Sequence, residues 1–367
     1  MNKLDPRKIY DDLHQIPELG FEEFKTSAYL ADKLEALGYK VTRNVGGTGV
    51  IGEIKGAEPG PVLMLRADMD ALPFLIDGVK KNIHACGHDA HSAMLLAAAA
   101  ELVDKVKRGT LRILFQQGEE TLKGALAIID AGVLEDVDIA LGLHIRPVQD
   151  IAFGEMSPAV RHAASTFVNI VINGLSSHGA RPHLGVNAIE AAAVAINAIT
   201  AIKINPIVPW SCKVTGIKGG GVAPNIIPDK VEMIVDARAQ TNEAMTELLE
   251  KLRRAVTNAA AALGAAAEVS TPGGVIPAAE YNDELTAEVA ECIVGVVGRE
   301  KLAKELVNPG GEDFHYFVNK YPHIKTAYFG VGAAAAPGLH HQDMQLNKEA
   351  LPSGTAVLVK MVERKLG

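Results

Sequence analysis

Short apolar runs alternate with longer amphipathic runs between residues 61 and 150, and this alternation constrains the fold most strongly. Runs typical of buried strands occupy 61–68, 111–117 and 139–145, whereas 90–106 and 122–131 have the pattern of helices. Strands joined by helices of this length pair in parallel through right-handed crossovers. We therefore predict an α/β fold, with a mixed, mostly parallel sheet flanked by helices.

The pattern changes near residue 157. Four strands are predicted at 165–173, 213–218, 231–239 and 267–270, and two helices at 186–202 and 243–263. Their order, β-α-β-β-α-β, is that of a ferredoxin-like unit. From Glu284 onward the helix and strand patterns of the first part return. We predict a catalytic domain of residues 1–156 and 274–367, with an inserted α+β domain of residues 157–273.

Composition excludes several classes of protein. Of the 367 residues, 48% are hydrophobic, but no apolar run approaches the roughly 20 residues of a membrane span. The first residues lack the apolar region of a secretory signal, and the cysteines Cys86, Cys212 and Cys292 are odd in number and widely spaced. We therefore expect a cytoplasmic protein. A net charge of −8 without a basic cluster argues against a nucleic-acid partner.

Polar side chains stand where three predicted strands end. Asp68 ends the first strand, Glu119 and Glu120 follow the second, and His144 lies near the end of the third. Ligands of open α/β sheets bind outside the carboxyl ends of the strands. These side chains therefore predict one common site.

A second polar segment precedes the predicted helix at residue 90. It reads His84-Ala85-Cys86-Gly87-His88-Asp89-Ala90-His91. Cys86 and His88 are two residues apart, so that in an extended segment their side chains face the same way. Thiolate, imidazole and carboxylate together are ligands of zinc or a similar metal. His340, after the apolar run 326–331, could supply a further imidazole.

The same residues also admit purely structural interpretations. Paired glutamates suit the first turn of a helix, and Asp89 suits a helix cap. His84 and His91 suit local hydrogen bonding, and the Cys-X-His spacing alone is a weak signal for a metal. The joint placement at strand ends favours a functional site.

These residues and others resemble the metal-dependent N-acyl-amino-acid amidohydrolases, which include bacterial aminoacylases, hippurate hydrolases and plant auxin-conjugate hydrolases. The resemblance covers nearly the whole chain. Its motifs lie at residues 14–23, 66–73, 84–91, 119–120, 177–183, 223–229 and 311–314.

The resemblance implies a site for two divalent metal ions, zinc or manganese, with cobalt also possible. Cys86 would bridge the two ions. His88 and His144 would complete one ion, and Glu120 with His340 the other.

It also implies the roles of residues around the ions. Glu119 would be the general base that takes a proton from the attacking water and delivers it to the leaving amine. Asp68 or Asp89 would orient the ligands through hydrogen bonds. The substrate would be an N-acyl amino acid or short peptide.

The inserted domain would serve as a lid and as the interface of a homodimer. His178 would reach the partner subunit's site as a catalytic residue, and Asn225 and Arg238 would bind the substrate carboxylate. From the residues alone, the segment 176–179 could equally be a polar turn. Arg238 could equally form a surface ion pair with Asp236 or Asp229.

Two alternatives to a deacylase stay open. A dipeptidase or carboxypeptidase would use the same two metals, and Glu312 is a candidate contact for a free amino group. A non-catalytic binding protein would not need Glu119. The segment 73–84 is several residues shorter than is usual in the family, beside the predicted metal site.

Overall fold

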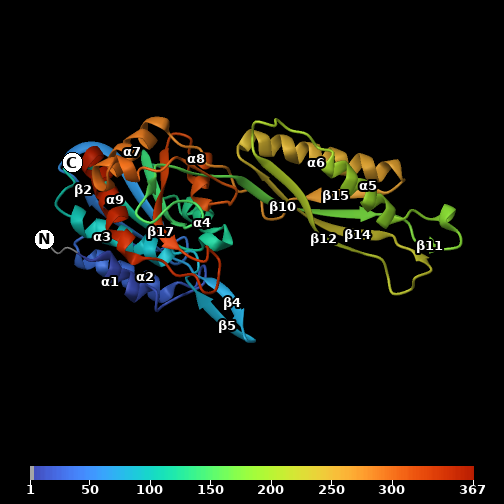
Figure 1. The fold of residues 1–367 in the computed structure, drawn as a ribbon, viewed down its shortest axis with the longest axis horizontal. Coiled ribbons are helices and arrows are strands. Elements are labelled where there is room, and N and C mark those ends of the chain that lie inside the picture. The colour runs from blue at the N-terminus through green and yellow to red at the C-terminus, as the bar shows by residue number, and fades with distance from the viewer. Residues whose placement is uncertain (1–3) are drawn as a thin grey trace. The chain divides into compact units, whose positions relative to one another are not determined.

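The computed structural model describes residues 4–367, and these residues form two compact units (Figure 1). Unit 1 comprises residues 4–161, Glu280–Leu306 and Glu312–Gly367, and unit 2 comprises His162–Ala279 and Val307–Gly311. The sequence placed the boundaries at 156/157 and 273/274, a few residues before those of the structure, and it did not assign 307–311 to the second unit. Residues 1–3, the start of the segment in which we saw no secretory signal, lie outside the described residues.

Unit 1 is built on a seven-stranded sheet of order β1-β2-β6-β3-β7-β17-β8. The inner strands β6 (Arg108–Gln116), β3 (Glu58–Asp68), β7 (Ile139–Pro147) and β17 (Lys325–Ala335) are parallel. The outer strands β1 (Lys40–Val45), β2 (Gly49–Lys55) and β8 (Met156–Ser157) pair antiparallel. The predicted mostly parallel sheet is confirmed.

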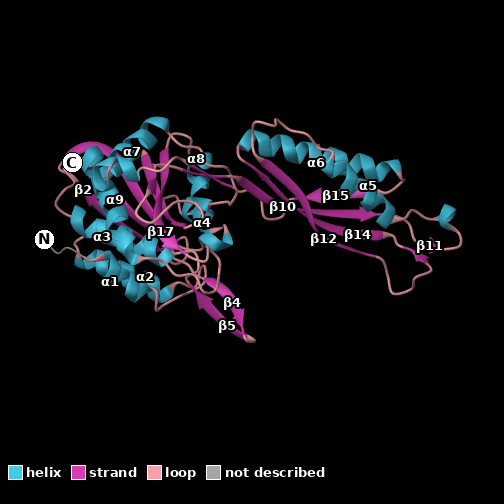
Figure 2. Ribbon diagram, viewed as in Figure 1, coloured by secondary structure: helices cyan, strands magenta, loops and turns pink. Residues whose placement is uncertain are grey.

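Helices cover both faces of this sheet (Figure 2). One face carries α1 (Pro6–Leu13), α2 (Phe24–Ala36), α3 (His88–Leu102), α7 (Asp283–Val297) and α9 (Leu351–Leu366), and the other carries α4 (Gly124–Asp130) and α8 (Tyr316–Lys320). The alanine run of α3 is buried on all sides, which explains why its sequence has no polar face. Among residues 4–367, none of the helices combines the length and apolarity needed to cross a membrane.

A hairpin that the sequence did not predict extends from unit 1 (Figure 1). It consists of β4 (Leu72–Ile76) and β5 (Val79–Ile83), joined at Asp77 and Gly78, and it occupies the short segment before the metal motif. Leu75 and Val79 are exposed, whereas Leu72, Phe74 and Ile83 are half-buried against the core of unit 1.

Unit 2 contains a four-stranded antiparallel sheet of order β12-β14-β10-β15. Its strands are β10 (Ala164–Asn173), β12 (Trp210–Gly219), β14 (Lys230–Ala239) and β15 (Ala266–Ser270), and its helices are α5 (Ala188–Thr200) and α6 (Asn242–Ala262). Buried and exposed residues alternate along β10 and β14, and both helices pack on the buried face (Figure 2). This is the arrangement predicted from the β-α-β-β-α-β order.

Short strands complete the chain. In unit 2, β11 (Ser177–His178) pairs with β13 (Ile226–Ile227). β9 (Val160–His162) and β16 (Leu306–Asn308) lie where the chain passes between the two units.

Candidate metal centre and active site

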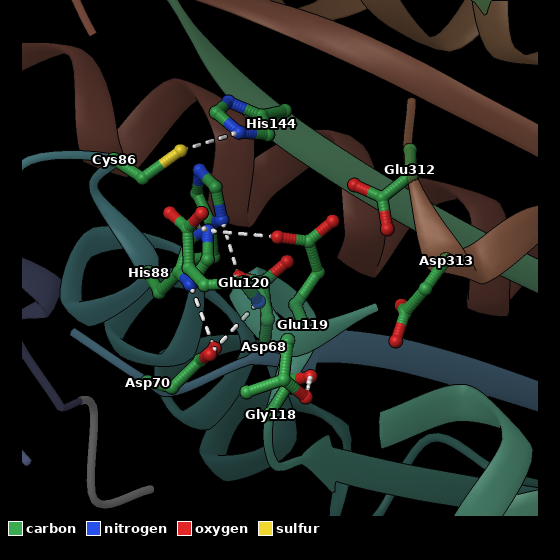
Figure 3. A network of polar contacts seen from close by, with 12 residues as sticks. Asp68, Asp70, Cys86, His88, Gly118, Glu119, Glu120, His144, Glu312 and Asp313 are labelled. Carbon is green, nitrogen blue, oxygen red and sulfur yellow. Dashed lines mark hydrogen bonds and ion pairs between the residues drawn. The ribbon is translucent and has the colours of Figure 1, made fainter. Parts of the chain in front are cut away.

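Cysteine, histidine and glutamate side chains come together in unit 1 beyond the carboxyl ends of β3, β6 and β7 (Figure 3). Among the described residues, five groups have candidate ligand atoms that all lie within 4.8 Å of one another. Three of them lie around Cys86 and His88: Cys86–His88–His144, Cys86–Glu120–His340 and His88–Glu119–Glu120. The first two groups share Cys86. They are the two ligand sets that the family resemblance implied.

Cys86 and His88 are brought together by a turn, because Gly87 between them adopts φ 89° and α3 begins at His88. We expected an extended segment here, and this prediction is wrong. Asp89 is not the helix cap that the sequence also allowed, since the cap position belongs to Gly87.

His144 projects from β7 toward Cys86. The cysteine Sγ lies 3.4 Å from His144 Nε2, and His144 Nδ1 lies 2.5 Å from the carbonyl oxygen of Ile145. Since a carbonyl can only accept, Nδ1 carries the proton and Nε2 offers its lone pair to the site.

Glu119 and Glu120 lie on a 3-10 turn, Glu119–Thr121, directly after β6, and Glu119 is buried. The turn follows Gly118, whose φ is 60°. Glu120 Oε1 lies 3.3 Å from His340 Nε2 and 3.9 Å from His88 Nε2, and Glu119 Oε2 lies 3.8 Å from His88 Nε2. His340 reaches the site because its backbone N–H donates to the carbonyl of Ala85 at 2.7 Å.

Three buried aspartates surround the candidate ligands and have different partners. Asp70 accepts from His88 Nδ1 at 3.0 Å and from the backbone N–H of Glu120 at 2.9 Å (Figure 3). Asp68 bonds His91 Nδ1 at 2.6 Å and is 3.9 Å from His88 Nδ1. The sequence interpretation named Asp68 or Asp89 for the orienting role, but the direct contact with His88 is made by Asp70.

Asp89 is paired with His14 rather than with a candidate ligand. Its Oδ2 lies 2.6 Å from His14 Nδ1, and its Oδ1 accepts from the N–H of Ala90. No local sequence pattern connects His14 to Asp89, a residue 75 positions away.

Arg66, fully buried on β3, binds the carboxylates behind Glu119. It donates to Asp68 and Asp313, each at 2.7 Å, and lies 3.1 Å from Glu312 Oε1. Glu312 also accepts from Tyr328 Oη at 2.7 Å. Both oxygens of Glu312 therefore have partners within the protein, which weakens its candidacy for binding a substrate's amino group.

The electrostatics of the site fit divalent cations. Burial raises the pKa of Cys86 well above its usual value, and the charge of Glu120 adds to this effect. Burial, with the charges of Glu312 and Glu120, likewise raises the pKa of Glu119 well above its usual value. His88 Nε2 is buried and lacks a hydrogen-bond partner among residues 4–367. Thiol, imidazole and carboxylate groups that face one another in this way are a suitable donor set for divalent metal ions.

The other predicted site residues belong to unit 2. His178 lies on β11 and Asn225 directly before β13, and the N–H of Gly179 donates to the Asn225 carbonyl at 2.7 Å. Arg238 lies on β14, where its Nε is 3.0 Å from Asp236, the ion pair that the sequence also allowed. Its Nη1 donates to the carbonyl of Pro309 at 2.8 Å.

Comparisons with known proteins agree with this site. Residues 64–364 match the description "Peptidase family M20/M25/M40". "Thermostable carboxypeptidase 1" of Saccharolobus solfataricus is 35% identical over 90% of this chain and 88% of its own. "N-acetyl-L-cysteine deacetylase" of Bacillus subtilis is 32% identical over 96% of this chain and 86% of its own.

A solved structure is also similar to this chain in three dimensions. The YXEP protein of Bacillus subtilis, described as a dinuclear metal binding peptidase from the M20 family, superposes with a TM-score of 0.82 at 29% identity, covering 98% of this chain and 97% of its own. The chain therefore belongs to peptidase family M20/M25/M40 and is a metal-dependent hydrolase.

Proposed function

We propose that the chain hydrolyses the amide bond of N-acyl amino acids, releasing the free amino acid and a carboxylate. The observation that carries this proposal is the pair of ligand groups that share Cys86, with Glu119 beside them. The relative named N-acetyl-L-cysteine deacetylase supports a substrate of this class.

The proposed ligands of one ion are Cys86, His88 and His144, and those of the other are Cys86, Glu120 and His340. Zinc suits the thiolate and imidazole donors, and manganese or cobalt could be held by the same set. When bound, two divalent cations would lower the pKa of the attacking water and polarise the scissile carbonyl.

The protein's own residues orient and carry the proton. Asp70 holds His88 so that Nε2 points into the site, and the Ile145 carbonyl does the same for His144. Glu119 is the general base: its Oε2 lies 3.8 Å from His88 Nε2, at the edge of the ligand groups. It accepts the proton of the attacking water and passes it to the leaving nitrogen.

Unit 2 is proposed to supply the rest of the substrate site. His178 acts as a donor to the oxyanion in the partner subunit of a homodimer, and Asn225 and Arg238 bind the substrate carboxylate. A planar guanidinium suits a carboxylate, which it can hold through two parallel hydrogen bonds. The unpaired, widely spaced cysteines support a reducing compartment, the cytoplasm, as the place of action.

A carboxypeptidase or dipeptidase is the second candidate, because a relative that is 35% identical carries the name carboxypeptidase. The deacylase is favoured over the dipeptidase because both oxygens of Glu312 are already bonded to protein groups. A panel of N-acetyl, N-benzoyl and dipeptide substrates, assayed with zinc, manganese or cobalt, separates the candidates by the preferred acyl group.

The mechanism is tested by a matched pair of variants in adjacent carboxylates. We expect Glu119→Gln to lower kcat by roughly 10²- to 10⁴-fold while metal content by elemental analysis stays unchanged, because only the proton acceptor is lost. Glu120→Gln should instead reduce the metal content. Near-normal turnover by Glu119→Gln would show that another group is the base, and equal metal loss in both variants would contradict the division of roles.

A further inference from the structure

We infer that His91 is a positioning residue that fixes the protonation of the metal ligand His144 through the backbone of Ile145. The inference rests on the proposed function, because it takes His144 to be a ligand. His91 itself contacts no proposed ion.

The first step is the state of the His91 ring, which is fully buried. The backbone N–H of Ile145 donates to His91 Nε2 at 2.9 Å. Since a backbone N–H can only donate, Nε2 carries the lone pair and the ring proton is on Nδ1. Nδ1 then donates to Asp68 at 2.6 Å, and Asp68 is held by Arg66 at 2.7 Å.

The second step is the position of Ile145 in the sheet. β7 pairs with β3 only as far as Gly142 opposite Arg66, whereas its pairing with β17 continues to Pro147. Beyond Gly142, the backbone N–H and the backbone carbonyl of Ile145 are both bonded to imidazole rings instead. His91 accepts its N–H, and its carbonyl accepts from His144 Nδ1 at 2.5 Å.

These contacts form one continuous series of hydrogen bonds from Asp68 to His144. Asp68 orients His91, His91 holds the Ile145 backbone, and the Ile145 carbonyl keeps the proton of His144 on Nδ1. His144 Nε2 therefore presents its lone pair toward Cys86, 3.4 Å away. A histidine with its proton on Nε2 could not bind a metal from that side.

A role for His91 as a ligand is the main alternative, because Asp68, His88 and His91 also form a group within 4.8 Å. A ligand needs a free lone pair facing the ion. The lone pair of His91 Nε2 is engaged by Ile145, and its Nδ1 is engaged by Asp68. The geometry therefore favours positioning over ligation.

Two amide substitutions separate the two bonds of His91. In His91→Gln the side-chain oxygen can replace Nε2 and accept from Ile145, whereas in His91→Asn the amide group reaches only as far as Nδ1. Loss of a group that orients a ligand weakens metal binding roughly 10- to 100-fold. We expect this loss in His91→Asn and a clearly smaller one in His91→Gln, measured by competition for zinc with a chromophoric chelator.

Controls distinguish positioning from general damage. Urea unfolding of both variants without metal gives their stabilities, and a purely structural role predicts equal zinc affinities in variants of equal stability. That outcome would overturn the inference. If His144→Ala leaves zinc content and affinity unchanged, the ligand set of the proposed function fails. If only His144→Ala loses zinc, the function stands and the role of His91 is refuted.

If a variant does not fold, the role of His91 can still be tested in the unsubstituted protein. In the zinc-loaded protein labelled with ¹⁵N-histidine, the nitrogen shifts report which ring nitrogen carries the proton. We expect the proton on Nδ1 in both His91 and His144. A proton on Nε2 of His91, or a zinc-shifted Nε2 signal there, would contradict the inference.

Discussion

Gly87 shows how one backbone conformation assembles the candidate ligands. Its φ of 89° reverses the chain between Cys86 and His88. A Cβ at this position would collide with the side chain of Ile145, the residue that also contacts His91 and His144. The glycine is therefore required twice, for the turn and for the close approach of β7.

Gly87→Ala tests this requirement against a matched control, Gly78→Ala. Gly78 has a similar φ of 77°, but no atom of residues 4–367 lies within 4 Å of a Cβ added there. We expect Gly78→Ala to lower the free energy of unfolding by about 1 kcal/mol and Gly87→Ala by about 2–4 kcal/mol, because crowding adds to the strain. Only Gly87→Ala should lose metal. Equal costs in urea unfolding would contradict the argument.

The pair of His14 and Asp89 makes a pH-dependent contribution to stability. The hydrogen bond that His14 donates to Asp89 raises the pKa of His14, although burial opposes the rise. A raised pKa stabilises the folded state fully below the unfolded value of about 6.5, and this contribution is lost as the pH rises through the folded value. In metal-free protein, the destabilisation by His14→Asn should therefore be largest near pH 6 and should shrink toward about pH 9.

The control for this prediction is His323→Asn, at an exposed position. Its free energy of unfolding should follow that of the unchanged protein at each pH. A penalty for His14→Asn that grows with pH would contradict the assignment.

The sequence predicted which kinds of residues gather at the site better than it predicted their partners. The motifs named all members of the two ligand groups that share Cys86. They did not separate Asp68 and Asp70 at the end of β3 from Asp89 in the first turn of α3, because the three aspartates differ only in distances that the fold sets. The signal available for Asp70 was its spacing of two residues from Asp68, the last residue of β3.

At the scale of elements, burial decided what the sequence revealed. The strands β3, β6 and β7 are buried along most of their length, and their apolar runs predicted them to within a few residues. The hairpin of β4 and β5 contains no fully buried residue: β4 alternates half-buried and exposed residues, and β5 is exposed up to Ile83. It therefore lacks the continuous apolar run that marks the buried strands. Its turn residues Asp77 and Gly78 were its one local signal.

The neighbouring strands β3 and β6 each carry an arginine, and the two arginines differ in how deeply their carboxylate partners are buried. Arg66 on β3 and its partners Asp68 and Asp313 are fully buried, whereas Arg112 on β6 binds partly exposed Glu53 and Asp136. Arg66→Met should lower the free energy of unfolding by about 3–5 kcal/mol, because buried carboxylates lose their counter-charge. Arg112→Met should cost clearly less, since water reaches its partners. Equal penalties in urea unfolding would refute the distinction.

At the scale of the whole molecule, the chain has separate hydrophobic cores in its two units. The change of pattern near residue 157 revealed the insertion, because both strands and helices changed their order there. The sequence did not predict that Val307–Gly311 belong to unit 2, since five residues are too few to show the pattern of a helix or strand.

Metal binding should stabilise one unit selectively, because the proposed ligands all lie in unit 1. Saturating zinc at about 100 times its dissociation constant would add about 2.7 kcal/mol of stability. Hydrogen exchange of chelator-treated protein should therefore slow in peptides from β3, α3 and β7 when zinc is added. Peptides from β10 and β14 serve as the internal control, and a uniform slowing would contradict the prediction.

The position of β17 has a consequence for how the protein is made. β17 lies between β7 and the edge strand β8, although unit 2 is synthesised between β7 and β17. At about 5–20 residues per second, the ribosome leaves β7 with an open edge for many seconds, and such edges recruit other strands. His340 follows β17 in the sequence, so the second ligand group can close only after β17 has been made. This edge of β7 therefore stays unpaired until β17, which starts at Lys325 of the 367 residues, has been synthesised.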